Sequence, residues 1–164
     1  LSYHKAEIDL LQTLQESLNQ FEPSFQEYGL ILEQRLPANT VALVQADEQR
    51  LQQLFHNLLK NSLRYTDAPG KLKVVFQTSA HWAEIQFTDT PPSVPAEALP
   101  HLFERLFRVE SSRNRLTGGA GIGLSICHNI VQAHGGSIQA SHSPLGGLQI
   151  TVKLPLKILN KKIN

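Results

Sequence analysis

The hydrophobic positions near the start of the chain follow a helical spacing. From Leu10 to about Gln26, apolar residues recur every three or four positions, with Pro23 near the end of the run. This spacing predicts an amphipathic helix whose apolar positions are Leu11, Leu14, Leu18, Phe21 and Phe25. The segments LILEQRLP and TVALVQ follow as two predicted short strands, separated by the turn PAN.

The rest of the chain contains two predicted hairpins and three further predicted helices. LKVVFQTS and AEIQFTD predict one hairpin, and GSIQASHS and LQITVKLP, joined by a turn at residues 144–147, predict a second. The helices are expected from an N-cap at Asp47 to about Tyr65, over PAEALPHLFERLFR, and from about Gly123 to Ala133. Because no internal repeat or low-complexity linker interrupts the chain, residues 1–164 are expected to form one α+β domain with helices on one face of a mixed sheet.

A polar stripe follows the apolar face of the helix predicted at 47–65. At about 100° per residue, the apolar face consists of Leu51, Leu54, Phe55, Leu58, Ser62 and Tyr65. Asn57, Asn61 and Arg64 line up beside it at positions i, i+4 and i+7. Asparagine is a mediocre helix former, so two of them on one stripe call for an explanation. Either their amide oxygens bind Mg²⁺ beside phosphate, with Arg64 holding phosphate charge, or the stripe is simply solvated.

A carboxylate is predicted on the buried face of a strand. In AEIQFTD the alternation places Ala83, Ile85 and Phe87 on one face, and the same parity places Asp89 with them. An inward carboxylate is costly unless it meets a donor. The donor is either the exocyclic amine of a ligand, such as adenine N6, or a backbone N–H of the following turn.

A glycine-rich loop leads into the last predicted helix, within RLTGGAGIGLSICHNIVQAHGG at residues 115–136. The segment is not a P-loop, because Leu124 stands where the phosphate-binding lysine is needed. Nor is it a dinucleotide fingerprint, because Gly119, Gly121 and Gly123 have the spacing G-x-G-x-G. Two interpretations stay open: an anion site at the helix N-terminus, or a flexible loop before an ordinary helix.

Composition excludes several classes of function. The 15 Lys and Arg residues are dispersed and the net charge is +1, which argues against a nucleic-acid partner. The only cysteine, Cys127, lies in an apolar helical pattern and is expected to be a buried free thiol. No apolar run approaches the roughly 18 residues of a membrane span, so the fragment is expected to be soluble. The absence of methionine suggests a piece of a longer protein.

Four motifs in order resemble the catalytic ATP-binding domain of sensor histidine kinases, the HATPase_c or GHKL (Bergerat) fold. HNLLKNSLRYTD resembles the N box, FTD at 87–89 the start of the G1 box, LFERLFR at 102–108 the F box, and GGAGIGLSI at 118–126 the G2 box. Within the family, NLLKNSLRYTD and HSPLGGLQITVKLPL most resemble envelope-stress sensor kinases of enteric bacteria. The resemblance implies a two-layer α/β sandwich, with a mixed, mostly antiparallel sheet covered on one face by three main helices.

The resemblance also implies roles for individual residues in binding ATP and Mg²⁺. Asn61 is implied as the metal ligand, Asn57 as a support of the phosphate site and Arg64 as a phosphate contact. Tyr65 is implied to pack on or beside the adenine, and Asp89 to accept a hydrogen bond from adenine N6. Val94 and Leu124 are implied to border the nucleotide, and Phe103, Arg105 and Arg108 to belong to the F box, with both arginines near the transferred phosphoryl group. Gly119, Gly121 and Gly123 are implied to close a lid, at about residues 109–120, over the phosphates.

The sequence departs from the family in the G1 box. The family pattern is D-x-G-x-G, but Pro91 and Ser93 occupy the two glycine positions here. Proline fixes φ and has no N–H, so residue 91 cannot donate a backbone hydrogen bond to a nucleotide. Nucleotide binding is still expected because Asp89 is retained, but with weaker affinity than is usual in the family.

The resemblance favours a kinase over a hydrolase. Related gyrase, chaperone and mismatch-repair ATPases carry a glutamate four residues before the metal asparagine, and Asn57 stands at that position here. Without a base to activate water, transfer to a protein acceptor is favoured. None of the seven histidines has the context of the acceptor. A separate dimerisation domain is therefore implied to carry it.

The implied whole protein is a sensor histidine kinase. It would be a homodimer in the bacterial inner membrane, with this domain in the cytoplasm and a cognate response regulator as partner. The fragment alone is expected to be monomeric. The alternative is a nucleotide-binding or docking module whose altered G1 loop impairs turnover.

Overall fold

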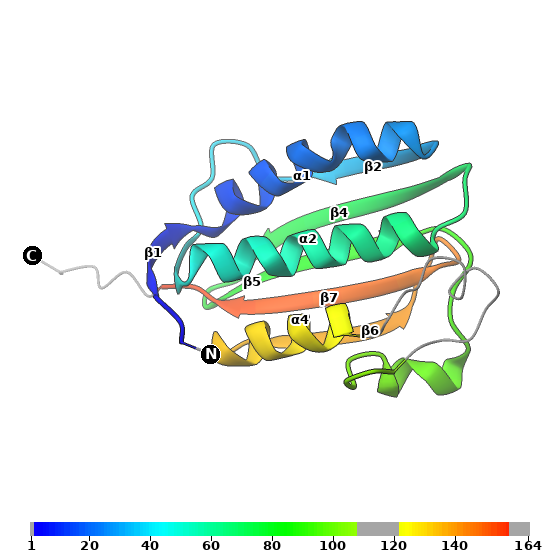
Figure 1. The fold of residues 1–164 in the computed structure, drawn as a ribbon. Helices are drawn as coiled ribbons and strands as arrows, with labels where there is room; N and C mark the ends of the chain where they lie inside the picture. The colour runs from blue at the N-terminus through cyan, green and yellow to red at the C-terminus, as the bar shows by residue number, and fades with distance from the viewer. Residues whose placement is uncertain (1, 108–121, 158–164) are drawn as a thin grey trace, which may run out of the picture.

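A five-stranded sheet forms one layer of the molecule. The computed structural model describes residues 2–107 and 122–157 (Figure 1). The sheet has the order β2–β4–β5–β7–β6, with β2 at Leu30–Arg35, β4 at Gly70–Thr78, β5 at Trp82–Asp89, β7 at Leu148–Pro155 and β6 at Ser137–His142. β2 runs parallel to β4, and the other neighbours are antiparallel. Both predicted hairpins, β4–β5 and β6–β7, are confirmed.

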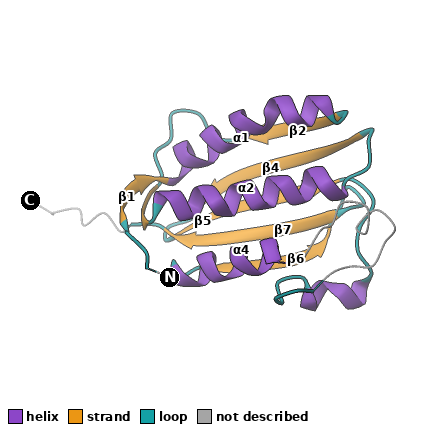
Figure 2. Cartoon of the chain, viewed as in Figure 1, coloured by secondary structure: helices purple, strands orange, loops and turns teal. Residues whose placement is uncertain are grey.

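Helices form the second layer, all on one face of the sheet (Figure 2). They are α1 at Leu10–Glu27, α2 at Glu48–Tyr65 and α4 at Ile122–Ala133. None of the described helices combines the length and the apolar character that crossing a membrane requires. The predicted α+β class, a mostly antiparallel mixed sheet with helices on one face, is confirmed.

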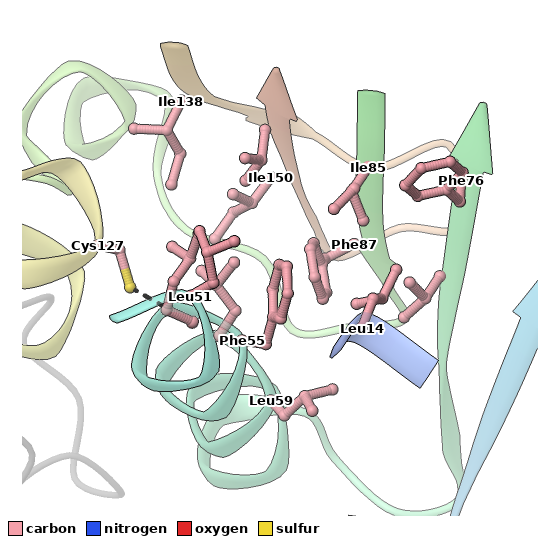
Figure 3. Close-up of a cluster of buried hydrophobic side chains, with 14 of the residues drawn as sticks. Leu14, Leu51, Phe55, Leu59, Phe76, Ile85, Phe87, Cys127, Ile138 and Ile150 are labelled. Atoms are coloured by element: carbon pink, nitrogen blue, oxygen red, sulfur yellow. Dashed lines mark hydrogen bonds between the residues drawn. The ribbon is translucent and has the colours of Figure 1, made fainter. Parts of the chain in front are cut away.

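The core lies between α2 and the central strands (Figure 3). Leu51 and Phe55 of α2 are fully buried and face Ile85 and Phe87 of β5, as the helical and alternating spacings predict. Cys127 of α4 is fully buried, and its thiol donates to the carbonyl of Leu54 at 3.8 Å. Cys127 is thus confirmed as the buried free thiol that the sequence predicts, and burial raises its pKa to about 12.

The first strands pair differently from their order in the sequence. The segment predicted as a strand at 40–45 forms β3 at Leu43–Ala46, and it does not pair with β2. Instead it pairs with β1, Ala6–Asp9, which the sequence pattern did not predict. The reason is that β2 is drawn into the main sheet beside β4, so β3 pairs with the segment before α1 in a separate two-stranded sheet.

The prediction of a helix at residues 95–108 is wrong. The structure has only a 3₁₀ helix, Ala96–His101, followed by turns up to Phe107. Pro100 lacks the N–H that an α-helix needs at that position, and Leu106 has a φ of 65°, which no right-handed helix accommodates. Residue 108, the end of the prediction, lies outside the described residues.

The segment before α1, which contains His4 and Lys5, is hydrogen-bonded to the start of α2 and to the end of α4. The carboxylate of Asp47, the N-cap of α2, accepts hydrogen bonds from the backbone N–H groups of His4 (2.8 Å) and Arg50 (3.1 Å). Lys5 donates to the carbonyl of Ala133, the last residue of α4, at 2.8 Å. The segment therefore holds α2 and α4 together at this end of the molecule.

A buried histidine completes this connection. His134 is 6% exposed; its Nδ1–H donates to the carbonyl of Ile130 (2.7 Å), and its Nε2 accepts from the backbone N–H of Asp47 (3.1 Å). The ring must be neutral to do both. Burial lowers the pKa of His134, with Lys5 acting in the same direction and the carboxylate of Asp47 opposing it.

We expect His134→Gln to weaken the acid sensitivity of the fold. Since the pKa of His134 is lower in the folded state than its ordinary value of about 6.5, the unfolded chain binds a proton more readily, and stability is lost as pH falls below about 6.5. Glutamine keeps an acceptor but does not titrate. Urea unfolding at pH about 7.5 and about 5 should show a larger loss for the wild type than for the variant.

A second substitution and a control complete this test. His134→Ala leaves the N–H of Asp47 without its acceptor and should cost about 1–3 kcal/mol at neutral pH. The exposed His81→Gln should behave as the wild type does. Equal acid sensitivity in the wild type and His134→Gln would show that His134 is not held neutral.

Candidate functional site

The predicted site residues gather at one end of the domain. Figure 1 shows the C-terminal end of α2, the end of β5, the start of β7 and the 3₁₀ helix at the same side of the molecule. The segment before α1 lies at the opposite side. α2 spans the distance between the two ends.

The polar stripe of α2 lies beside its buried face, as predicted. Asn57 and Asn61 are half-buried, Arg64 is exposed, and Tyr65, the last residue of the helix, is half-buried. Within the described residues, the side chains of Asn57 and Asn61 form no hydrogen bond. Two amides one turn apart at the edge of the core are therefore available to a ligand on this side of the domain.

Asp89 ends β5 with its side chain buried. The residue is 8% exposed, so the inward orientation predicted from the alternation is confirmed. Its Oδ1 accepts the backbone N–H of Leu148 at 2.7 Å, and its Oδ2 accepts the hydroxyl of Ser62 at 3.3 Å. The backbone donor comes from the start of β7, the strand next to β5, rather than from the turn that follows Asp89. The sequence did not predict Leu148 or Ser62 as its partners.

Burial dominates the electrostatics of this carboxyl group. It raises the pKa of Asp89 to about 6, although hydrogen bonds from Leu148, Ser62 and Thr66 act in the opposite direction. The protein thus keeps a carboxylate whose ionised form is costly even with three donors around it. Strongly shifted titrations of this kind are frequent at functional sites.

The altered G1 segment is tied to its surroundings by backbone hydrogen bonds. The carbonyl of Pro91 accepts the N–H of Asp67 at 3.1 Å, and the N–H of Thr90 donates to the carbonyl of Lys71 at 3.0 Å. Further on, the Nε2–H of His142 donates to the carbonyl of Val94 at 2.9 Å. Val94 is half-buried and packs against the core, beside the predicted site.

The residues predicted for the F and G2 boxes are only partly described. Phe103 is half-buried and stacks on His128 of α4, with ring centroids 6.3 Å apart, and Arg105 is exposed. Leu124 is buried in the first turn of α4, and the Cα of Gly123 faces open space. Arg108, Gly119, Gly121 and the lid predicted at 109–120 lie outside the described residues.

A metal at this end would need ligands beyond the protein's carboxylates and histidines. Residues 2–107 and 122–157 contain no group of three His, Cys, Asp or Glu side chains that could hold a metal ion. Amide oxygens from Asn57 and Asn61 fit a hard cation that takes most of its ligands from phosphate and water. The donor set is therefore compatible with a cation that arrives with a phosphate ligand.

A hollow elsewhere on the molecule contains none of the predicted residues. It has a volume of about 470 Å³ and lies at the opposite end of β5, where it is lined by Gln77, Thr78, Ser79, Trp82, Glu84, Ser137 and Lys153. Trp82 and Asp89 are the two ends of the same strand. The hollow is thus separate from the candidate site.

Comparison with known proteins identifies the family to which the chain is similar. Residues 46–158 match the family of histidine kinase-, DNA gyrase B- and HSP90-like ATPases. The chain is 47% identical over 157 residues to the signal transduction histidine-protein kinase BaeS of Escherichia coli, covering 96% of this chain and 33% of BaeS. It is 34% identical over 154 residues to the adaptive-response sensory kinase SasA of Microcystis aeruginosa, covering 93% of this chain and 39% of SasA.

A solved structure shows the same architecture. The catalytic domain of histidine kinase ThkA superposes with a TM-score of 0.80 at 25% identity, covering 93% of this chain and 95% of that one. The chain spans about a third of the length of the curated relatives it matches. It belongs to the histidine kinase-, DNA gyrase B- and HSP90-like ATPase family, as the ATP-binding catalytic domain of a sensor histidine kinase.

Proposed function

We propose that this domain binds Mg²⁺·ATP where α2, β5 and β7 meet, and transfers the γ-phosphoryl group to a histidine on a dimerisation domain. The observation that carries the proposal is the buried carboxylate of Asp89. It lies against Ser62 of α2, the helix that also presents Asn57 and Asn61. A desolvated acceptor and two available amides on adjoining elements suit a ligand with a base amine at one end and phosphates at the other.

The base is held by the Asp89 end of the site. Its carboxylate accepts the adenine N6 amine, while Leu148 and Ser62 keep the two oxygens in place. Tyr65 packs beside the base, and Val94 and Leu124 border it. The half-buried positions of Tyr65 and Val94 and the burial of Leu124 support these roles.

The phosphates lie along the polar stripe of α2. Asn61 is the protein ligand of Mg²⁺, Asn57 supports the phosphate site, and Arg64 contacts phosphate oxygens. Mg²⁺ held by Asn61 would supply positive charge that offsets the negative charge of the phosphates. The exposed position of Arg64 lets its guanidinium reach a phosphate at the rim.

The transferred group is stabilised from the F box. Arg105 and Arg108 neutralise charge on the γ-phosphoryl group, and Phe103 anchors the segment against α4. Gly119, Gly121 and Gly123 allow the lid to close on the phosphates, with the N-terminus of α4 adding its N–H groups. The bond from phosphorus to the β-phosphate oxygen breaks, a bond to the histidine nitrogen forms, and ADP leaves.

The amide at position 57 favours transfer over hydrolysis. Asparagine cannot act as a general base toward water, so a bound nucleotide lacks the proton acceptor that hydrolysis uses. Transfer to a positioned histidine depends mainly on geometry and charge stabilisation. The domain therefore acts as a kinase.

Two protein partners follow from this function. One is the histidine-bearing dimerisation domain of the same protein, and the other is a cognate response regulator that takes the phosphoryl group. ThkA has been solved in complex with the response regulator protein TrrA. The proposed setting is the cytoplasmic side of a bacterial inner membrane, where the whole protein is a homodimer and this domain is one soluble, monomeric part.

A phosphotransfer assay distinguishes this function from a docking module with impaired turnover. The domain is mixed with a separately produced dimerisation hairpin that carries the acceptor histidine, in the presence of radiolabelled ATP and Mg²⁺. We expect acid-labile phosphohistidine on the hairpin. If a hairpin that accepts phosphate from another kinase gains none here, the docking module is the better description.

We expect Asn61→Ala to remove the Mg²⁺-dependent part of nucleotide affinity. Titration with a non-hydrolysable ATP analogue should show at least about tenfold weaker binding with Mg²⁺, which corresponds to about 1.4 kcal/mol, and little change without it. Asn19→Ala is a matched control, because Asn19 is an exposed asparagine on α1. If the Asn61 variant binds the analogue as tightly as the wild type in the presence of Mg²⁺, Asn61 is not the ligand of Mg²⁺.

We expect Asp89→Asn to lose nucleotide affinity and gain stability. Burial raises the pKa of Asp89 from 3.8 to about 6, so ionisation costs the folded state about 1–3 kcal/mol at pH about 8. Asparagine avoids that cost while still accepting the N–H of Leu148. Denaturant unfolding should show the gain at pH about 8.

The pH dependence provides the check on this prediction. A raised folded pKa means that the penalty is present above pH about 6 and disappears as pH falls toward 3.8, so the advantage of the variant should shrink over that range. The exposed Glu97→Gln should change neither stability nor affinity. A variant less stable than the wild type at pH about 8 would contradict the assigned cost.

A further inference from the structure

The turn between β6 and β7 packs directly on Asp89. The N–H of Gly147 donates to the backbone carbonyl of Asp89 at 3.1 Å, and the next N–H, that of Leu148, donates to its side-chain Oδ1 at 2.7 Å. Two consecutive backbone donors thus fix the main chain and the carboxylate of one residue. This requires the turn to approach β5 very closely.

The close approach requires glycine at position 147. A Cβ there would lie 2.2 Å from Oδ1 of Asp89, 2.4 Å from the carbonyl oxygen of Thr90 and 2.5 Å from that of Asp89. Two of these three atoms belong to the backbone and cannot rotate away. A methyl group must therefore push the turn from β5 or turn the carboxylate out of its position.

The same turn also supports the proline that replaces a family glycine. Gly146 has a φ of 99°, and a Cβ on it would lie 3.0 Å from Cγ of Pro91. At the end of β6, His142 donates to the carbonyl of Val94. The segment from Asp89 to Val94 is therefore held at both ends by residues 142–148.

The turn is itself braced by Ser143, which is 9% exposed. Its N–H donates to the carbonyl of Gly147 (2.8 Å), its carbonyl accepts the N–H of Gly146 (3.0 Å), and its hydroxyl accepts the N–H of Leu145 (2.9 Å). The side chain of residue 143 thus acts on Asp89 only through the shape of the turn. It offers a way to loosen the turn without adding a clash.

We propose that the β6–β7 turn, residues 143–147, positions Asp89 for purine recognition, with Gly147 as the residue that permits it. The close backbone approach that the G1 glycines would allow from one side is supplied in this chain from the neighbouring strand. The proposal rests on the proposed function, because it assumes that Asp89 contacts the base. Gly147 and Ser143 are positioning residues and do not contact the nucleotide.

The test compares Gly147→Ala with Gly136→Ala. Gly136 precedes β6, and a Cβ on it would lie 2.1 Å from the carbonyl of Lys153, so both substitutions strain the β6–β7 hairpin, at opposite ends. Titration with a non-hydrolysable ATP analogue and Mg²⁺ should show at least about tenfold weaker binding for Gly147→Ala. Gly136→Ala should stay within about twofold of the wild type at a temperature where both are folded.

A pH profile separates positioning from general loosening. Without the N–H of Leu148 on Oδ1, the pKa of Asp89 rises, so the pH at which analogue binding is half lost should move upward in Gly147→Ala. In Gly136→Ala it should not move. Binding within twofold of the Gly136 variant, with an unshifted profile, would overturn the proposal.

If Gly147→Ala does not fold, Ser143→Ala tests the positioning role of the turn instead. It should weaken binding by about threefold and shift the pH profile in the same direction, while the exposed Ser141→Ala leaves both unchanged. Equal behaviour of the two serine variants would then overturn the proposal. Asp89→Ala separates a failure of the proposed function from a failure of this inference. If Asp89→Ala binds the analogue as tightly as the wild type, Asp89 does not bind the base. If Asp89→Ala loses binding but the Gly147 and Ser143 variants bind as the wild type does, only the positioning role is rejected.

Discussion

The carboxylate of Asp89 is out of water, and this constraint fixes much of the structure around it. A buried carboxylate is tolerated only where donors surround it. They come here from Ser62 near the end of α2 and from Leu148 at the start of β7. The helix and the two strands must therefore meet at one point, so the packing of the two layers and the geometry of the site are set by the same contacts.

The same helix connects this point to the opposite end of the domain. The N-cap of α2 is Asp47, which accepts the backbone N–H of His4 and donates its own N–H to His134. The last turn of the helix carries Ser62, which donates to Asp89. Its 18 residues span about 27 Å as one rigid element. The asparagines therefore keep a fixed relation both to the core and to the segment before α1. That segment also binds the end of α4, through Lys5 and Ala133, so both helices of the proposed site are joined there.

Helical spacing and strand alternation predicted the structure correctly wherever the local sequence alone determined which side chains are buried. The alternation in β5 predicted the burial of Asp89, and the helical spacing predicted the stripe of Asn57 and Asn61. Local rules failed where a distant partner decided. Nothing in TVALVQ shows that β3 pairs with β1, because that pairing depends on β2 joining β4. The helical pattern over 95–108 was outweighed by Pro100, whose missing N–H is a backbone property that hydrophobic spacing ignores.

The partners of Asp89 were also beyond the sequence, for a related reason. From the sequence, two consecutive glycines in a hairpin indicate only a turn. That Gly147 lies against the carboxylate of Asp89, 58 residues earlier, follows only from the neighbouring positions of β5 and β7. This contact bears on the G1 box, where Pro91 removes a donor and conformational freedom. What the site needs is a backbone that can come close to Asp89, and sheet pairing lets a neighbouring strand meet that need. A loop without glycine at position 91 is therefore compatible with a fixed Asp89 carboxylate, because the backbone of the β6–β7 turn lies close enough to bind it.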